Sequence, residues 1–279
     1  MGSTEQERTW ALAHGGYSEW LNKETNPTTV SLTYEYLIAN TEVTVAQYRQ
    51  FVKSTGYKAD AYRGNLPLTW DNSKKGWRRE KGRTWENPTI EQGDQHPVVC
   101  LTWSDANAFC EWLTKKERSI GLIGTNQQYR LPTEAEWQYA CLGTSNTYYA
   151  WGNDPSNALL HANVIDATPQ PDGSVSEVPH YPWLDGYFFT APVASFKPTQ
   201  HGLFDVHGNA WEWCHNWYYP YPGGKETDPM GPAIGKQRVM RGGSWDNYTA
   251  TFRANSRRVV RSNFSSDTTG FRIVLVSEF

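Results

Sequence analysis

The second half of this 279-residue chain carries no helical periodicity, and this constrains the fold more than any other feature. After about residue 143 the sequence is rich in Gly, Pro, Asn, Asp and aromatic residues, which is typical of loops and short strands. Residues 239–245 and 270–276 predict strands, and residues 57–96 are also irregular. Irregular stretches of this length are uncommon in a globular domain unless metal ions or a function hold them in place.

Three helices and one further strand are expected in the first half. Residues 29–38 alternate with β-branched and aromatic side chains, which predicts a strand. One helix begins after Thr44 and ends at Gly56, a second is capped by Ser104, and a third opens at a capping box that starts at Thr133. The chain has no internal repeat, linker or compositional break, so we expect one domain over residues 1–279.

The composition excludes several classes of protein. An aromatic fraction of 14% supplies enough apolar surface to offset the entropy of ordering, so the chain is not disordered. The net charge of −3 creates no general attraction for nucleic acid or an anionic membrane, and the basic run 74–83 is interpreted as a solvated loop. There is no apolar run of 18 residues and no signal-peptide pattern. We expect a monomer without nucleic-acid or membrane partners, cytoplasmic as given, or at the cell surface if the chain is a fragment.

The four cysteines, Cys100, Cys110, Cys141 and Cys214, each lie among apolar neighbours. No Cys-x-x-Cys pair is present, so a structural zinc site is not expected. Four cysteines in a chain of this length are also too few for a disulfide-dense scaffold. We interpret them as buried free thiols in a reducing compartment, with two disulfides as the alternative. No cysteine follows Cys214.

Two groups of oxygen-bearing residues are candidate sites for a hard cation. Between Asp205 and Glu212 the chain is irregular and offers main-chain carbonyls, and Ca²⁺ takes six to eight oxygen ligands of these kinds. The alternative is a capped turn beneath a tryptophan cluster. Asn163 and Asp185 flank the long loop 166–184, and an ion that joined its two ends would anchor it. Neither spacing is specific by itself.

Other catalytic motifs are absent. The histidines form no His-x-x-x-His pair, so a transition metal would need ligands brought together by tertiary folding. No Gly-x-Ser-x-Gly, P-loop or Gly-x-Gly-x-x-Gly motif supports a hydrolase or a nucleotide-binding fold. The Arg-rich polar stretch 253–269 lies between two expected strands and is typical of a binding loop on a rigid scaffold, although it can also be an ordinary connector.

Several segments taken together resemble the formylglycine-generating enzyme (sulfatase-modifying factor) superfamily. They occur in the order of that family and cover nearly the whole chain. The most specific are Arg-Leu-Pro-Thr-Glu-Ala-Glu-Trp (130–137), Gly-Leu-Phe-Asp-Val-His-Gly-Asn-Ala-Trp-Glu-Trp (202–213), Arg-Gly-Gly-Ser-Trp (241–245) and Gly-Phe-Arg (270–272). The resemblance implies an α+β, C-type-lectin-like domain with little regular secondary structure, stabilised by Ca²⁺.

The resemblance also implies which residues hold calcium. One ion would be bound by Asp205, Glu212 and the carbonyls of Gly208 and Ala210. The other would be bound by the residues Asn163, Val164 (carbonyl), Asp185 and Tyr187 (carbonyl).

The catalytic part of the family does not carry over to this sequence. Its enzymes oxidise a substrate cysteine with two copper-binding cysteines that follow the Gly-Gly-Ser motif, and here Asn247 and Phe252 occupy those places. Without thiolates there is no soft ligand set for Cu(I) and no redox pair, so no copper and no formylglycine-generating activity are expected. The disulfide partners that secreted members place in this region are also missing, which favours free Cys110 and Cys141.

Two functions are compatible with this pattern. The first is a non-catalytic ligand-binding domain, as in the variable proteins of diversity-generating retroelements. Residues 246–277 contain no Lys, Glu, Gln, Met or Trp, as expected if AAC-type codons are mutated at adenine. The alternative is an oxygen-dependent oxidoreductase with cysteine-independent metal chemistry, for which the required set of three histidines is not visible in the sequence.

We expect a peptide, protein or small-molecule ligand at a site formed by the C-terminal loop 246–269 and the residues beside it. Aromatic and Arg side chains dominate binding hot spots. If the loop is a recognition surface, several of its side chains should be exposed while Trp245 and Phe271 are buried. The expected ligand-binding residues are Trp211, Ser244, Trp245, Asn247, Tyr248, Phe252, Arg257, Arg258, Arg261 and Phe264.

Overall fold

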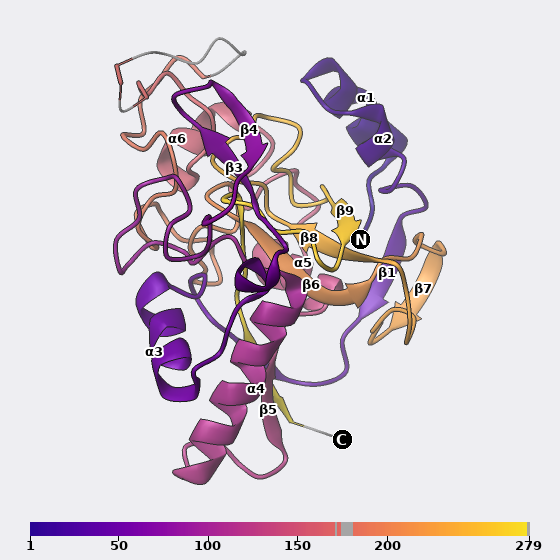
Figure 1. Cartoon of the computed structure of the whole chain (residues 1–279). Coiled ribbons are helices and arrows are strands. Elements are labelled where there is room, and N and C mark those ends of the chain that lie inside the picture. The colour runs from indigo at the N-terminus through magenta and orange to yellow at the C-terminus, as the bar shows by residue number, and fades with distance from the viewer. Residues whose placement is uncertain (171, 174–180, 278–279) are drawn as a thin grey trace.

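The computed structural model describes residues 1–170, 172–173 and 181–277. Short helices and strands are joined by long connections, and helices α1 and α2 lie at the opposite side of the molecule from α3 (Figure 1). The elements of the first half are α1 (Glu5–Ala13), α2 (Ser18–Leu21), β1 (Thr28–Ser31), β2 (Tyr36–Ile38), α3 (Val45–Thr55), η1 (Asp60–Arg63), β3 (Leu68–Asp71), β4 (Gly76–Arg79), α4 (Trp103–Ser119), β5 (Gln127–Arg130) and α5 (Glu134–Leu142). No helix of the described chain is long and apolar enough to span a bilayer.

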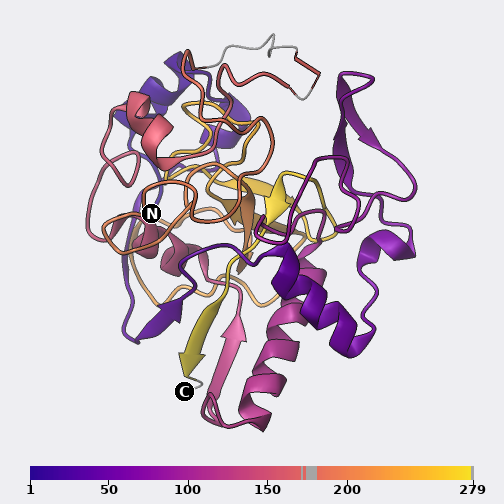
Figure 2. The same ribbon diagram turned by 90° about the vertical axis from the view of Figure 1, so that its left-hand side faces the viewer.

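The second half holds mostly strands. Its elements are η2 (Pro155–Asn157), α6 (Ala158–His161), β6 (Trp211–Trp217), β7 (Gly224–Thr227), β8 (Gln237–Arg241), β9 (Arg258–Arg261), β10 (Thr269–Gly270) and β11 (Val274–Ser277). A four-stranded sheet has the order β10-β6-β8-β9, and a three-stranded antiparallel sheet has the order β2-β11-β5. Strands β11 and β5 lie side by side next to helix α4 (Figure 2).

The helices begin where local side chains satisfy their first backbone N–H groups. Thr44 and Gln47 form a capping box for α3, and Thr133 and Glu136 form one for α5, so both predictions are confirmed. The prediction that Ser104 caps the next helix is wrong. Ser104 already lies inside α4, because the Thr102 hydroxyl accepts the N–H of Asp105 at 3.2 Å.

The expected strands are shorter than the sequence suggests. The strand expected at 29–38 is two strands, since β1 pairs with β7 whereas β2 pairs with β11. The segment 239–245 leaves its sheet at Arg241, because Gly242 and Gly243 adopt φ values of 98° and 84°. The irregular region 57–96 contains the β3–β4 hairpin, and most of the basic run 74–83 forms its turn and second strand. Helices α1 and α2 were not expected.

The main core is aromatic and lies between α3, α4 and the four-stranded sheet. Phe109 of α4 packs against Tyr48 and Phe51 of α3 and lies 5.6 Å from the ring of Phe271. Trp213 of β6 is fully buried in the same cluster. The α+β fold expected from the resemblance is therefore assembled around the C-terminal segment of the chain.

Buried arginines hold the irregular C-terminal segment in place. The Arg253 guanidinium forms ion pairs with Glu7 and Glu24, and Arg257 pairs with Glu134 at 2.6 Å. All of these side chains are buried. The irregular stretch is thus fixed by ion pairs to distant parts of the chain, and breaking such a pair leaves an uncompensated buried charge.

Candidate functional site

The floor of the candidate site is the segment that leaves β8. The Ser244 hydroxyl donates to the Asp246 carboxylate at 2.5 Å, and the Ser244 N–H donates to Asn247 Oδ1 at 3.0 Å. Gly243 is required in this turn, because a Cβ there would lie 2.5 Å from the Cβ of Phe252. Burial raises the pKa of Asp246, and the Arg258 charge opposes this shift. The loop is therefore closed by its own side chains.

The β3–β4 hairpin forms one wall. The Trp77 ring stacks on Trp245 with 5.9 Å between centroids, and the Arg79 guanidinium lies 5.9 Å from the centre of the Phe264 ring. Trp245 is held from below because its indole N–H donates to the Asp267 carbonyl at 3.2 Å. The hairpin thus contacts both ends of the loop.

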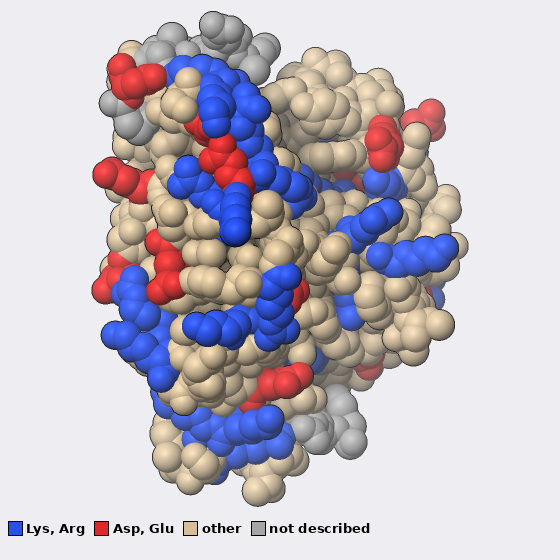
Figure 3. Space-filling view, viewed as in Figure 1, with Lys and Arg blue, Asp and Glu red and all other residues tan. Residues whose placement is uncertain are grey.

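The N-terminal helices form the opposite wall. The Tyr17 hydroxyl lies 3.3 Å from that of Tyr248, and Trp20 meets Trp211 edge to face at 5.9 Å. Gly15 permits this approach, since a Cβ there would lie 2.2 Å from the Tyr248 ring. In the space-filling view the surface is hollowed between the hairpin and helices α1 and α2 (Figure 3). We call this site the aromatic groove and define it by Tyr17, Trp20, Trp77, Arg79, Trp211, Trp245, Asp246, Tyr248, Arg258 and Phe264.

The aromatic groove contains hydrogen-bond donors without acceptors. Arg258 is half-buried, and its guanidinium lies 4.8 Å from the ring centre of Phe264 and 5.9 Å from that of Trp211. Within the described residues no hydrogen bond or ion pair engages this guanidinium, and burial lowers its pKa. The Trp211 indole N–H has no acceptor there either, but Trp211 is buried beneath the groove, so Arg258 is the donor that a ligand can reach. Unpaired donors among aromatic rings suit a ligand that offers acceptors and flat apolar surface.

The structure brings together most of the residues expected to bind ligand. Tyr248, Arg258 and Phe264 line the aromatic groove and Asn247 adjoins it, whereas Arg261 lies exposed at the end of β9. Trp211, Ser244 and Trp245 are 0%, 0% and 5% exposed, so they support the groove from beneath and offer almost no surface to a ligand. Tyr248, Arg258 and Phe264 are half-buried. Trp245 and Phe271 are 5% and 0% exposed, so the prediction that they are buried is confirmed. The prediction that several of the expected loop contacts are exposed is wrong, because only Arg261 among them is exposed.

The prediction is wrong for Phe252 and Arg257. Phe252 is 0% exposed and packs 5.3 Å from the ring of Tyr149, because the chain turns inward after Ala250. Arg257 is also 0% exposed, pairs with Glu134 and stacks 3.9 Å from the ring of Tyr221. These two side chains hold the loop from beneath and do not face a ligand.

Asp246 lies in the expected loop but was not among the residues expected to bind. Four groove residues outside the loop were not anticipated either: Tyr17, Trp20, Trp77 and Arg79. They come from the two walls, which lie far from the loop in sequence. The only available signal was the tryptophan within the basic run, since an aromatic ring beside several cations is unusual for a purely solvated loop.

No reactive thiol lies at the groove. Asn247 and Phe252 stand where the resemblance places the catalytic cysteines, and all four cysteines are free and buried. Cys141 Sγ lies 3.4 Å from His207 Nε2, but burial raises the pKa of Cys141 to about 12 and lowers that of His207 to about 4. This pair is therefore a neutral thiol and a neutral imidazole at physiological pH.

The family is shown by comparison with known proteins. The model of the sulfatase-modifying factor enzyme 1-like domain matches residues 2–276. The chain belongs to this family. The formylglycine-generating enzyme of Streptomyces coelicolor is 34% identical over 260 residues, which cover 84% of this chain and 76% of that enzyme. The mouse inactive Cα-formylglycine-generating enzyme 2 is 28% identical over 259 residues, covering 82% of this chain and 71% of that protein.

Two solved structures share the fold of this chain. PvdO of Pseudomonas aeruginosa matches with a TM-score of 0.65 and 24% identity, covering 88% of this chain and 82% of that one. Variable protein 1 of Treponema denticola matches with a TM-score of 0.62 and 25% identity, covering 89% and 86%. The α+β fold class expected from the sequence is confirmed.

Asn163 and Asp185, which the resemblance implies as ligands of one Ca²⁺, have buried oxygens that a cation can bind. Asn163 Oδ1 and Asp185 Oδ2 are buried, and neither has a hydrogen-bond donor among the residues that the structure describes. Burial raises the pKa of Asp185 to about 7. The loop 166–184 between them includes residues 171 and 174–180, which lie outside the described residues. Two buried oxygens without donors are what a bound hard cation would satisfy.

The ligand set around Asp205 and Glu212 fits a cation less simply. Asp205 Oδ1 and Glu42 Oε2 receive no donor from other described residues, but burial raises the pKa of Glu42, so its protonated carboxyl can donate to Asp205. Both oxygens of Glu212 accept from Arg272, at 2.6 and 2.7 Å. The Trp137 indole N–H also donates to Glu212, at 2.7 Å. Within the described part of the chain, no three His, Cys, Asp or Glu side chains gather as a metal site. Metal binding by Glu212 stays a prediction.

Proposed function

We propose that this chain is a non-catalytic, calcium-stabilised ligand-binding member of the family and that the aromatic groove is its recognition site. The observation that carries the proposal is the pair of residues at the catalytic positions. Asn247 bonds within its own turn and Phe252 fills the core, so neither supplies a thiolate. The groove nevertheless keeps aromatic rings and an Arg without an acceptor, which are the side chains that dominate binding hot spots.

Two relatives support a binding role. One curated relative is named inactive, and one structural neighbour at 25% identity is named a variable protein. The ligand is a peptide, protein or small molecule with acceptor groups and an aromatic or apolar body. Diversification of the loop by a retroelement is part of the same hypothesis and would be supported by a reverse transcriptase gene and a near-repeat of the 3′ end beside this gene.

The experiment for the absent activity uses a sulfatase-type cysteine peptide, Cu(I) and oxygen. The Streptomyces enzyme, run in parallel, is the positive control. We expect the peptide mass to stay unchanged with this protein. Loss of the thiol mass together with an aldehyde-reactive product would refute the proposal.

The experiment for binding selects peptides from a random library on the native protein. We expect Trp77→Ala and Arg258→Met to weaken the selected peptides at least tenfold. Leu37→Ala is the matched control, because Leu37 is 70% exposed on β2 and does not belong to the groove. If all three variants bind equally, the groove is not the recognition site.

The second candidate function is an oxidoreductase with cysteine-independent metal chemistry. It is favoured by the 34% identity to a formylglycine-generating enzyme. A metal inventory of the purified protein separates the two functions, since calcium alone supports a binding domain, whereas stoichiometric copper or iron supports an oxidase.

We also propose that Asn163 and Asp185, with the carbonyls of Val164 and Tyr187, hold a structural Ca²⁺. The donorless buried oxygens of the two side chains support this assignment. The ion would join the two ends of the long loop and stabilise the native state by mass action.

A further inference from the structure

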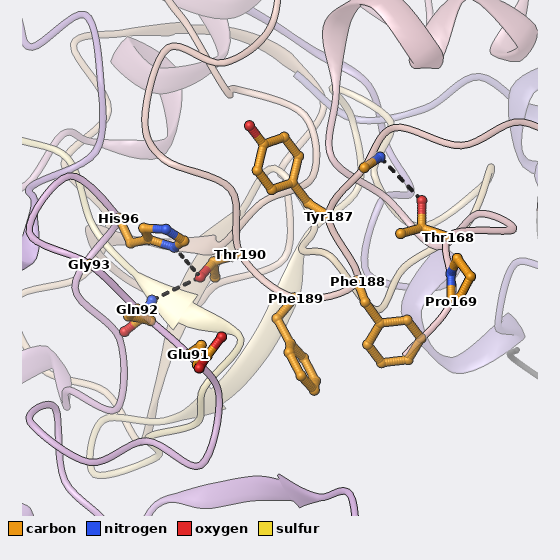
Figure 4. Close-up of a pocket in the computed structure, with 11 residues that line it drawn as sticks. Glu91, Gln92, Gly93, His96, Thr168, Pro169, Tyr187, Phe188, Phe189 and Thr190 are labelled. Carbon is orange, nitrogen blue, oxygen red and sulfur yellow. Dashed lines mark hydrogen bonds between the residues drawn. The ribbon is translucent and has the colours of Figure 1, made fainter. Parts of the chain in front are cut away.

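A separate pocket lies on the other side of Trp245. It has a volume of about 540 Å³ and is formed by three segments: 91–96, 168–169 and 186–190 (Figure 4). This volume is within the range of roughly 300–1,000 Å³ that is usual for small-molecule sites. Neither the sequence motifs nor the groove assigns it a role.

The polar side of the pocket is fixed by Thr190. Its hydroxyl accepts from the Gln92 amide at 2.9 Å and lies 3.1 Å from His96 Nδ1, so the O–H is free to donate to that nitrogen. Burial lowers the pKa of His96, which keeps the ring neutral. The side-chain amide oxygen of Gln92, Oε1, is buried without a donor among the described residues. This side therefore carries no positive charge, and Gln92 Oε1 is an unpaired hydrogen-bond acceptor.

The apolar side consists of two perpendicular rings. Phe188 and Phe189 lie 5.0 Å apart with an interplanar angle of 86°, and both are half-buried. Trp245 supports Phe189 edge to face at 5.1 Å, which restricts its motion. In Figure 4 both rings extend to the same side as the Glu91 carboxylate, while the Tyr187 ring points away. In that view Phe189 lies between Phe188 and Glu91, so Phe189 is the ring beside the Glu91 carboxylate.

Apart from the Ca²⁺ proposed at the Tyr187 carbonyl, the charge in the described lining of the pocket is negative. Among the described residues that line it, Glu91 is the single charged side chain at neutral pH, and it is exposed. A cation near the rings gains from their quadrupoles and from the carboxylate, with no neighbouring Lys or Arg in the lining to repel it. An anion would be repelled by the negative faces of the rings and by the Glu91 carboxylate.

We propose that this pocket binds a small organic ammonium group, with the cation between the Phe189 ring and the Glu91 carboxylate. The proposal does not rest on the aromatic groove, so either can fail without the other. The ammonium can belong to a free metabolite or to a methylated lysine of a peptide, because both present the same chemistry.

Choline and 3,3-dimethyl-1-butanol test the proposal, because the alcohol has the shape of choline with carbon in place of the charged nitrogen. Each is titrated into the ¹⁵N-labelled native protein, and the amide shifts are mapped. We expect choline to shift Gly186, Thr190 and their neighbours and to bind at least tenfold tighter than the alcohol. Equal affinities, shifts elsewhere or no shifts would overturn the proposal.

Two variants test the named contacts. Glu91→Gln removes an exposed charge without disturbing the core, and we expect it to weaken choline several-fold while leaving the alcohol unchanged. Phe189→Leu should weaken choline as well, provided that its melting temperature shows a native fold. Glu5→Gln, an exposed site on α1, is the control. Unchanged choline affinity in Glu91→Gln would overturn the role of the carboxylate and with it the proposal.

A peptide with a trimethyllysine distinguishes the two sources of the ammonium. Tighter binding of this peptide than of choline, with the unmethylated peptide as control, indicates a modified protein. The reverse order indicates a free metabolite. Both results support the ammonium site.

Discussion

At the scale of single residues, Asp267 is a carboxyl group buried beneath the aromatic groove. Its Oδ2 accepts the Trp70 N–H at 2.7 Å, and its side chain is 0% exposed. Burial, with a smaller contribution from the Asp246 charge, raises the pKa of Asp267 to about 8, although the Trp70 bond opposes the shift. The native protein therefore holds a proton on Asp267 at pH values where the unfolded chain has released it.

This protonation predicts a pH dependence of stability. The folded pKa lies above the unfolded value, so the contribution of Asp267 is fully present below about pH 4 and is lost as pH rises to about 8. Asp267→Asn should reduce the loss of unfolding free energy between pH 5 and pH 8 by more than about 1.4 kcal/mol, the equivalent of one pKa unit. Urea denaturation at both pH values measures this, with Asp94→Asn as an exposed control. An unchanged difference would show that Asp267 is ionised in the native state.

At the scale of elements, the loop after β8 is bound to helix α1 and the segment that follows α2. Arg253 reaches Glu7 in α1 and Glu24 beyond α2, and its guanidinium also donates to the Ala250 carbonyl at 2.8 Å. The N-terminal wall of the groove is therefore held by the same residue that shapes the loop. The part of the loop around Arg253 is therefore structural, and its amino acids cannot vary freely without loss of stability.

Arg253→Met should destabilise the protein strongly. It leaves Glu7 and Glu24 buried without their cation, a change that costs about 3–5 kcal/mol in comparable buried pairs. Arg261→Met, on the same segment but exposed, should change the unfolding free energy by no more than about 0.5 kcal/mol. Urea denaturation compares the two variants, and similar losses would contradict the structural role of Arg253.

At the scale of the whole molecule, ion pairs and the proposed calcium ion replace regular secondary structure as the means of ordering long connections. A calcium ion at about 100 to 1,000 times its Kd stabilises the native state by about 3–4 kcal/mol. For a domain of this size we expect EDTA to lower the melting temperature by roughly 5–10 °C.

The ligand set is tested by one substitution. Asp185→Asn removes the buried carboxylate at the calcium site formed with Asn163 and should abolish most of the EDTA effect. The exposed control Asp94→Asn should keep the EDTA effect. Melting curves in calcium and in EDTA provide the measurement for all three proteins. Identical curves for the native protein with and without chelator would refute the calcium proposal.

Local features of the chain could be predicted from the sequence because the residues that cause them lie within a few positions of one another. The helices at Thr44 and Thr133 begin where a hydroxyl and a side chain three residues later satisfy the first N–H groups. The absence of cysteine after Cys214 excludes the family's catalytic pair whatever the fold. The sequence motifs, in their order, also identified the family that the comparison confirmed.

The position of each loop side chain was decided by tertiary structure alone. Arg257 and Arg258 are adjacent and chemically identical, yet Arg257 is buried against Glu134, 123 residues away, while Arg258 faces the groove. The groove walls are formed by Trp20 and Trp77, which meet Trp211 and Trp245 only after the chain has folded. The sequence determines which side chains are able to form an ion pair or a ring contact. The partner that buries each of these side chains comes from a distant segment, so the tertiary structure decides which contact forms.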